Sequence, residues 1–376
     1  MAQPTIRISW WQLTTLLVIT KLAMLLSYAP ILAPVVGPAH KVARNGWLAA
    51  PLAAGIAFLI AMLVYLLARN FPGLTVFEYS QILLGKYLGT ALNLGIVLLM
   101  LDTAARALHL FTLFIKVTVL KLTPWGVIAG ILMILCVRAV MSGFETIARV
   151  AEFLVPILLL VILLMFASLI PELDLGALQP VFADGFRPVF QQALSPIVIF
   201  GEASWVALLA LPYLNRIQEG PKALGVGLGI NAAVVGTGAV ILLTLLGAPM
   251  VELLAFPTHT AARIMTLGTA LQRPEWAIYP MWIGTLFIHI AQLLYGMTTG
   301  AGTILRLKDP RWLSIPFAIL CLAWSVYVFP DITAVFQSFE PKYSLPRNLP
   351  LELGVPLLLL AALGVRKLLA GPGRVF

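Results

Sequence analysis

The chain has 376 residues, of which 61% are hydrophobic and 10% are charged. Soluble globular proteins have about 25% charged residues, so this composition excludes an ordinary water-exposed surface. The formal net charge of +9 is better explained by orientation in a membrane than by nucleic acid, because Lys and Arg are more frequent in the loops on one side of the expected bundle. We therefore predict an integral membrane protein with both termini in the cytoplasm and no nucleic-acid partner.

Apolar segments of about 20 residues follow one another along the chain, and each matches the roughly 30 Å hydrocarbon thickness at 1.5 Å per helical residue. They cover approximately residues 11–36, 47–68, 88–120, 124–142, 149–170, 189–214, 223–248, 278–305, 312–330 and 350–369. The first is too long for the apolar core of a cleaved signal peptide. No gap is long enough for a soluble domain, so we predict one all-α transmembrane domain over residues 1–376 with about ten transmembrane helices.

Prolines, glycines and polar residues separate these segments. Residues 69–73 end the second segment, and Pro310 separates the eighth from the ninth. Residues 76–85 are too short and too polar to cross a bilayer, so we expect them to form an interfacial helix at the cytoplasmic face. Two longer external segments, 172–188 and 250–279, are expected to pack over a central cavity, as lids do in transporters.

The segments divide into two sets of five, approximately 8–170 and 189–370, and the first member of each set is interrupted. The first segment contains Ser27-Tyr28-Ala29-Pro30, and the sixth contains Phe200-Gly201-Glu202. Gly- or Pro-interrupted helices at matching positions in two halves are the best sequence indication of an inverted-repeat transporter site. Free backbone groups at membrane depth are tolerated only where they line a cavity. The pattern therefore predicts a small-molecule site between broken helices 1 and 6.

Lys21 and Glu202 lie near the middle of the first and sixth segments. Two lone charges at bilayer depth are costly, so we expect them to pair. The pair has two interpretations: a salt bridge that only fixes helix packing, or a charge pair that a ligand's ammonium and carboxylate groups, or a proton, can disturb. The candidate ligand-binding residues are Lys21, Ser27, Tyr28, Phe200, Gly201, Glu202 and Ala203.

A second group of titratable residues lies on the third segment. Asp102, Arg106 and His109 are spaced by four and three residues, which places them on one helical face. They form either an internal ion pair facing the bundle or, with His289 of the eighth segment, a gate or proton path. His289 has no second His or Cys at ligand spacing, so no metal site is expected. The sequence has no phosphate loop, HExxH or GxSxG motif, and we predict neither an enzyme nor a cofactor.

Several motifs in order along the chain resemble the B subunit of bacterial spore-germination nutrient receptors, the GerAB-like family of the amino acid–polyamine–organocation superfamily. They are ISWWQL (8–13), RNFPGLTVFEYSQILLGKYLG (69–89), GFETIARVAEFLVPI (143–157), PELDLGALQPVF (171–182), FGEASW (200–205) and LKDPRWLSIPF (307–317). The resemblance implies a leucine-transporter-like fold with helices 1 and 6 unwound around a pocket for an amino acid or similar nutrient. It also implies residence in the spore inner membrane, with receptor A and C subunits as partners.

One departure from that family lies in the first segment. Ala23 and Leu25 occupy positions where the resemblance implies glycines, and Lys21 is expected to take over the charge that the open backbone would provide. We therefore expect a nutrient-binding subunit that signals germination, and the alternative is a proton-coupled amino acid permease that works alone.

Overall fold

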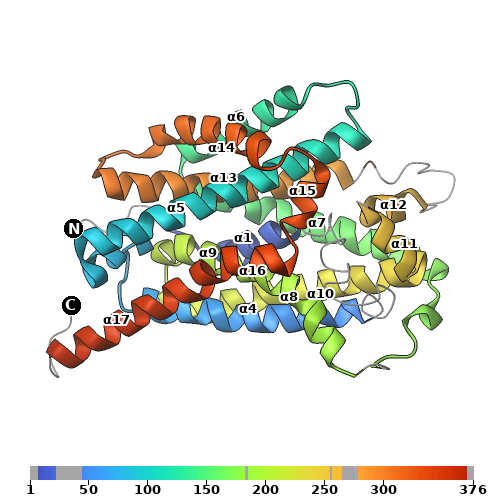
Figure 1. Cartoon of the computed structure of the whole chain (residues 1–376), viewed down its shortest axis with the longest axis horizontal. Helices are drawn as coiled ribbons and strands as arrows, with labels where there is room; N and C mark the ends of the chain where they lie inside the picture. The colour runs from blue at the N-terminus through green and yellow to red at the C-terminus, as the bar shows by residue number, and fades with distance from the viewer. Residues whose placement is uncertain are drawn as a thin grey trace.

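A computed structural model describes residues 7–22, 45–182, 185–254, 256–264, 276 and 278–370 of the chain. This part is almost entirely helical, and nine of its helices are long and apolar enough to cross a membrane (Figure 1). The first expected segment is described as α1 (Trp10–Leu22). The expected interruption at Ser27 and Tyr28, with Ala23 and Leu25, lies outside the described residues.

The other elements follow the order expected from hydropathy. In the first half they are α4 (Gly46–Ala68), α5 (Val76–Thr118), α6 (Trp125–Ser142), α7 (Phe144–Leu169), η2 (Ile170–Glu172) and η3 (Leu175–Leu178). Next come α8 (Arg187–Gly201), α9 (Ala203–Ala210), η4 (Leu211–Tyr213), η5 (Ile217–Glu219), α10 (Gly220–Leu246), α11 (Ala248–Leu253) and α12 (Pro257–Ile264). The last are α13 (Ile278–Leu305), η7 (Arg311–Leu313), α14 (Ser314–Val328), α15 (Ile332–Gln337), α16 (Pro341–Leu349), the π-helical turn η8 (Pro350–Gly354) and α17 (Val355–Ala370).

The expected interfacial helix is the first part of α5. Gly85, with φ 80° and ψ 171°, separates it from the membrane span that follows, and only glycine adopts this conformation without strain. The two parts fold back on each other, because Ser80 donates to Asn93 Oδ1 at 2.7 Å and Asn93 donates to the Phe77 carbonyl at 2.7 Å. A Cβ on Gly89 would lie 2.6 Å from the Cα of Gln81, so glycine is also needed for this close approach.

The last span begins earlier than its hydropathy suggests. We expected it over 350–369, but the continuous helical segment runs from residue 341 to residue 369. The polar residues of α16 that resembled a loop in the sequence face the protein interior, where Ser344 and Asn348 are buried. This places Glu352 well inside the span rather than at its edge.

Span 6, made of α8 and α9, forms the centre of the bundle. In the apolar 18-residue stretch within residues 187–213, 94% of the residues are buried. The corresponding share is 22% in residues 144–172 and also in residues 311–328. α4 packs on α8 and α10, α5 packs along α13, and α1 lies among α7, α10 and α13 (Figure 1). The outer helices expose leucine and isoleucine side chains, as expected for surfaces that contact lipid.

The two ends of the described chain lie on the same face. Ile8 forms a parallel bridge with Leu214, donating its N–H to the Tyr213 carbonyl at 2.8 Å. Lys367, in the last turn of α17, donates to Asn70 Oδ1 at 2.8 Å. The last turn of α4 and the first turn of α10 are also neighbours, because a Cβ on Gly220 would meet the ring of Tyr65.

Candidate functional site

The centre of the site is an ion pair between the two residues expected to meet. Lys21 Nζ donates to Glu202 Oε2 at 2.7 Å, and the two side chains are 1% and 4% exposed. Glu202 is the single residue between α8 and α9, so the interruption of span 6 falls where the sequence indicated. This interruption of the helix is short, because Glu202 keeps helical dihedral angles and still donates its N–H to the Val198 carbonyl.

Beside this pair lies a second buried carboxyl that we did not predict. Glu352 is fully buried, and a Cβ on Gly201 would overlap its carboxylate. Lys21, Glu202 and Arg106 all lie within electrostatic range of Glu352. Gly201 is therefore required for a close contact between span 6 and the last span, which consists of α16, η8 and α17 and is called span 10 below. Phe200 and Ala203, also predicted at this site, are buried on either side of the Gly201-Glu202 step.

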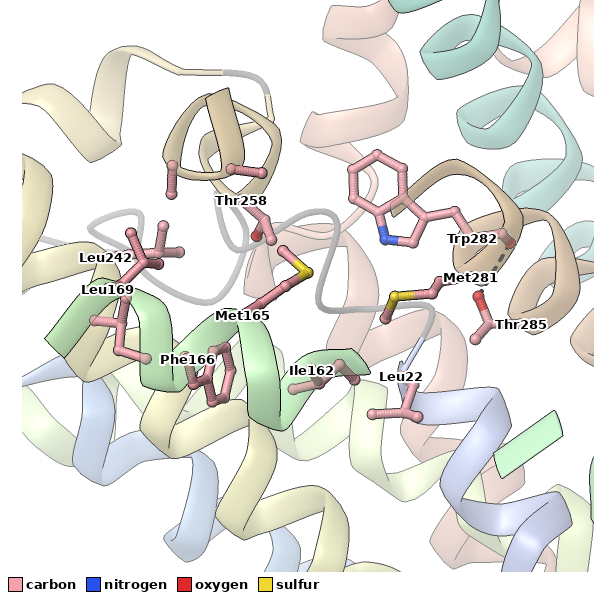
Figure 2. Close-up of a pocket in the computed structure, with 14 residues that line it drawn as sticks. Leu22, Ile162, Met165, Phe166, Leu169, Leu242, Thr258, Met281, Trp282 and Thr285 are labelled. Atoms are coloured by element: carbon pink, nitrogen blue, oxygen red, sulfur yellow. Dashed lines mark hydrogen bonds between the residues drawn. The ribbon is translucent and has the colours of Figure 1, made fainter. Parts of the chain in front are cut away.

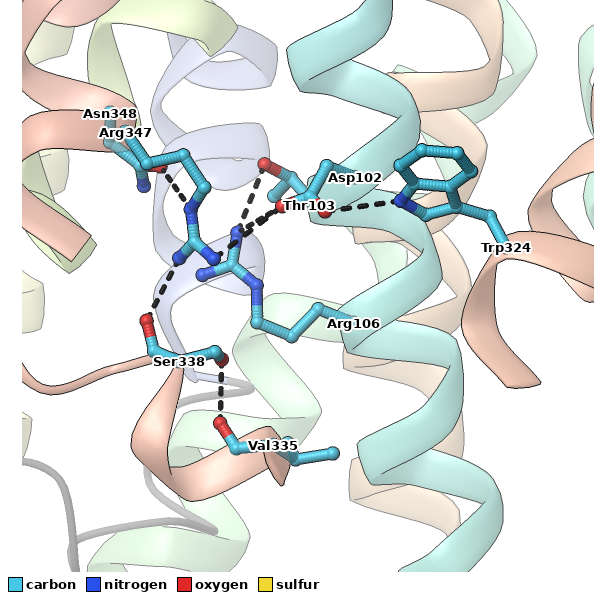
Figure 3. A network of polar contacts seen from close by, with 8 residues as sticks. All are labelled: Asp102, Thr103, Arg106, Trp324, Val335, Ser338, Arg347 and Asn348. Atoms are coloured by element: carbon cyan, nitrogen blue, oxygen red, sulfur yellow. Dashed lines mark hydrogen bonds and ion pairs between the residues drawn. The ribbon is translucent and has the colours of Figure 1, made fainter. Parts of the chain in front are cut away.

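A polar network next to the site joins α5, α14 and span 10 (Figure 3). Asp102 accepts hydrogen bonds from Arg106 at 3.4 Å and from the Trp324 indole at 3.1 Å, and Arg347 lies 3.6 Å away. Arg347 also donates to the Ser338 carbonyl at 2.9 Å. Because the Asp102 carboxylate interacts with the guanidinium groups of both Arg106 and Arg347, the network holds the three elements together.

The predicted trio on α5 is divided by the structure. Asp102 and Arg106 interact, whereas His109 packs against the rings of Trp125 and Phe329 with centroids 5.9 and 6.5 Å away. His109 therefore lies outside the Asp102 network. The gating roles stay predictions, and Arg106 is the member of the trio that lies within electrostatic range of Glu202 and Glu352.

Three cavities follow one another along α13. Met281, Trp282 and Thr285 line an apolar cavity of about 50 Å³. His289, Gln292 and Leu293, with Glu202 and Trp205, line a cavity of about 10 Å³, close to the space that one water molecule needs. Tyr295, Thr298 and Thr299 line a polar hollow of about 730 Å³. The path from residue 281 to residue 299 is about 27 Å along the helix, which is close to the roughly 30 Å thickness of the hydrocarbon core.

The apolar cavity is enclosed by four helices and the end of α1. Figure 2 shows Ile162, Met165 and Phe166 of α7 facing Met281 and Trp282 of α13. The short helix α12, which lies within the external segment 250–279, covers one side with Thr258, Ala261 and Ala262. Most of its wall is apolar, so it lacks the charged groups that an ionic or zwitterionic solute would need.

A pair of tyrosines separates the central cavity from the polar hollow. The hydroxyl groups of Tyr213 and Tyr295 are 2.9 Å apart, and both side chains are buried. The ring of Phe144 lies 4.9 Å from Tyr295 and 5.4 Å from Tyr213. In the hollow beyond them, hydrogen bonds from Arg311 lower the pKa of Asp309.

The structure thus brings together Lys21, Glu202, Gly201 and His289 from the predicted set, and it adds Glu352, Arg347 and Gln292. A carboxylate in the apolar sequence Leu351-Glu352-Leu353 was the signal that could have identified Glu352. Among the described residues, no group of three or more His, Cys, Asp or Glu side chains could hold a metal ion.

The fold is similar to those of solved transporters. One is Mhp1, a nucleobase-cation-symport-1 family transporter solved with bromovinylhydantoin bound. It matches with a TM-score of 0.67 and 14% identity, over 96% of this chain and 77% of Mhp1. A Na⁺-coupled sialic acid symporter in a substrate-bound outward-open state matches with a TM-score of 0.63 and 14% identity, over 95% of this chain and 80% of the symporter. MhsT in complex with L-phenylalanine matches with a TM-score of 0.55 and 13% identity, over 93% of this chain and 97% of MhsT. At these identities the similarity concerns the fold, which is leucine-transporter-like.

The sequence is similar to spore germination proteins. Spore germination protein KB of Bacillus subtilis (strain 168) is 24% identical over 357 residues, covering 94% of this chain and 93% of that protein. Spore germination protein YndE of the same organism is 23% identical over 291 residues, covering 76% and 78%. The model of the family described as "Spore germination protein" matches residues 7–331. This chain is therefore an integral membrane protein that belongs to the spore germination protein family.

Proposed function

We propose that this protein is the transporter-like subunit of a spore germinant receptor, which binds a small polar nutrient beside the Lys21–Glu202 pair and signals germination. The observation that carries the proposal is the buried ion pair at the interruption of span 6, next to the cavity lined by Glu202, His289 and Gln292. Family membership supports the role in germination, and the transporter-like fold supports a central ligand site.

The proposed ligand contacts use opposite charges. A ligand's anionic group would bind Lys21 and its cationic group would bind Glu202, so that each charge exchanges one partner for another and none is left alone in low dielectric. Phe200, Gly201 and Ala203 would form the wall on span 6. Ser27 and Tyr28, outside the described residues, complete the proposed set.

Signalling requires that the ligand favour one arrangement of the bundle. A ligand shifts an equilibrium only through its differential affinity for the two states. The resemblance to nutrient receptors suggests that A and C subunits read this shift in the spore inner membrane, with both termini of this chain in the cytoplasm. These partners and this orientation are part of the proposal.

The test is ligand binding by purified protein in lipid nanodiscs, with a panel of amino acids and other small polar nutrients. Lys21→Ala and Glu202→Gln should weaken binding of a ligand found in this way by about 10-fold to 100-fold, because hydrogen bonds to charged groups contribute about 1.5–3 kcal/mol. Glu172→Gln, which changes an exposed carboxylate, should bind normally. Unchanged affinity and unchanged germination in both site variants would place the site elsewhere.

A proton-coupled permease is the second candidate, favoured by the three cavities in series along α13. A permease should accumulate its solute in proteoliposomes when a pH gradient is imposed, without any partner subunit. Binding without uptake under the same conditions would favour the receptor. Both candidates bind the solute, but only the permease transports it, so binding and uptake measured on one preparation distinguish them.

A further inference from the structure

Glu352 is a buried carboxyl group without a hydrogen-bond donor. Its side chain is 0% exposed, and neither oxygen forms a hydrogen bond within the described part of the chain. The Trp205 indole comes close enough to influence the carboxylate but does not reach hydrogen-bond geometry. An ionised carboxylate in this environment is strongly destabilised, because it has lost its water and has no donor in contact.

The cations around Glu352 are already engaged with other groups. Lys21 of α1 donates to Glu202 at 2.7 Å. Arg106 of α5 donates to Asp102 and Thr103. These cations and the Glu202 carboxylate, which repels a second negative charge, all act on Glu352 from a distance.

Arg347, on the same span as Glu352, is engaged as well. It donates to Asn348 at 3.0 Å and to the Ser338 carbonyl at 2.9 Å, and it lies beside Asp102. Its field reaches Glu352, but a field from a distance does not replace a donor in direct contact, because desolvation dominates when a carboxylate has none. The neutral acid is the form that fits this place.

We infer that Glu352 is a proton-binding site in the core of the protein, protonated in the arrangement seen here, and that Lys21 is shared between Glu202 and Glu352. If Lys21 moves from Glu202 to Glu352, the proton passes from Glu352 to Glu202. The number of protons and the net charge of the three groups then stay the same, so the exchange strands no charge in the bilayer. This inference requires no ligand and goes beyond the proposed function.

The experiment is infrared spectroscopy of the full chain in lipid nanodiscs without ligand, following the carbonyl band of protonated carboxylic acids at neutral pH. We expect one buried band that disappears in Glu352→Gln. The band should persist or grow in Lys21→Met, where Glu202 loses its ammonium partner and also takes up a proton. Glu172→Gln, which changes an exposed carboxyl at the end of η2, should leave the band unchanged.

Thermal unfolding of the same variants provides a second measurement. Glutamine is nearly isosteric with the protonated side chain, so Glu352→Gln should keep the wild-type Tm at neutral pH. The inference is overturned if the wild type has no protonated band, if the band survives in Glu352→Gln, or if Glu352→Gln lowers Tm as expected for a missing counter-ion. None of these results depends on whether a nutrient binds, so the inference and the proposed function can fail separately.

Discussion

Lys21 and Glu202 are 181 positions apart in sequence and share one short hydrogen bond in the middle of the protein. Taking both charges out of water is costly, and their attraction only offsets that cost when both are present. The pair therefore matters most when it is broken on one side. At the scale of single residues, the site is a set of charges that depend on one another.

This dependence predicts a non-additive pair of mutations. Lys21→Met and Glu202→Gln should each lower the free energy of unfolding by about 1.5–3 kcal/mol, because each removes the hydrogen bond between the two charged groups and forces the remaining partner to change its protonation or its neighbour. The double variant should lose clearly less than the sum of the single losses. Thermal unfolding of the four proteins in detergent measures this coupling, and simple additivity would show that the two charges are not linked in solution.

Gly201 gives the second prediction at this scale. Gly201→Ala should lower Tm, because its Cβ would overlap the Glu352 carboxylate. Glu352→Ala should remove this obstacle, so the double variant Gly201→Ala/Glu352→Ala should unfold at about the temperature of Glu352→Ala alone. A full additional loss in the double variant would mean that Gly201 is needed for a different reason, such as helix geometry.

At the scale of elements, α5 is two helices joined at one residue. The Gly85 conformation, with φ 80°, strains any other residue by about 1–3 kcal/mol. Nothing lies within 4 Å of a Cβ built there, so the backbone alone requires glycine. The joint allows the interfacial helix to turn back onto the span that contains Asp102 and Arg106.

We therefore expect Gly85→Ala to lower the free energy of unfolding by about 1–3 kcal/mol, measured by thermal or chemical unfolding in detergent. Gly95→Ala is the matched control on the same helix, because it also has nothing within 4 Å of its Cβ and no positive φ is recorded for it. It should be neutral or slightly stabilising, since alanine favours helix more than glycine does. Equal losses in both variants would contradict a conformational cause.

At the scale of the whole molecule, α13 passes three cavities, and the Tyr213–Tyr295 contact closes one step between them. Tyr213 lies at the end of span 6 and Tyr295 lies on α13, so separating the two tyrosines requires these elements to move apart. One hydrogen bond contributes about 1 kcal/mol. Such a contact can bias an equilibrium between closed and open arrangements without locking it.

This arrangement predicts greater access to the central cavity when the contact is lost. Tyr213→Phe or Tyr295→Phe should raise the labelling rate of Leu293→Cys by a membrane-impermeant thiol reagent by about fivefold, in a background with Cys136 and Cys321 replaced. The reagent is added on the side of the polar hollow. Tyr87→Phe, at an exposed position on α5, should leave the rate unchanged, and equal rates in all variants would mean that the tyrosines do not control access.

The membrane spans could be predicted from sequence because the requirement for them is local. Any stretch of about 20 apolar residues fits the bilayer, and the breaks predicted at residues 69–73 and at Pro310 lie close to the ends of helices in the structure. The start of the last span was predicted too far along the chain, because the polar residues Arg347 and Asn348 were interpreted as part of a loop. Hydropathy reports composition and does not say whether a polar side chain faces a loop or the protein interior.

By itself, the sequence determined that this is a membrane protein of about ten spans with a charged centre, and it placed Lys21 opposite Glu202, because a lone charge at bilayer depth needs a partner. Only the tertiary structure decided which other groups join that pair. Glu352 meets Gly201 because α16 packs on α8, and Arg347 meets Asp102 because the last span also packs on α5. Tyr213 meets Tyr295 because the end of span 6 packs on α13. Contacts between residues so far apart in the chain follow from helix packing, which no local pattern of residues encodes.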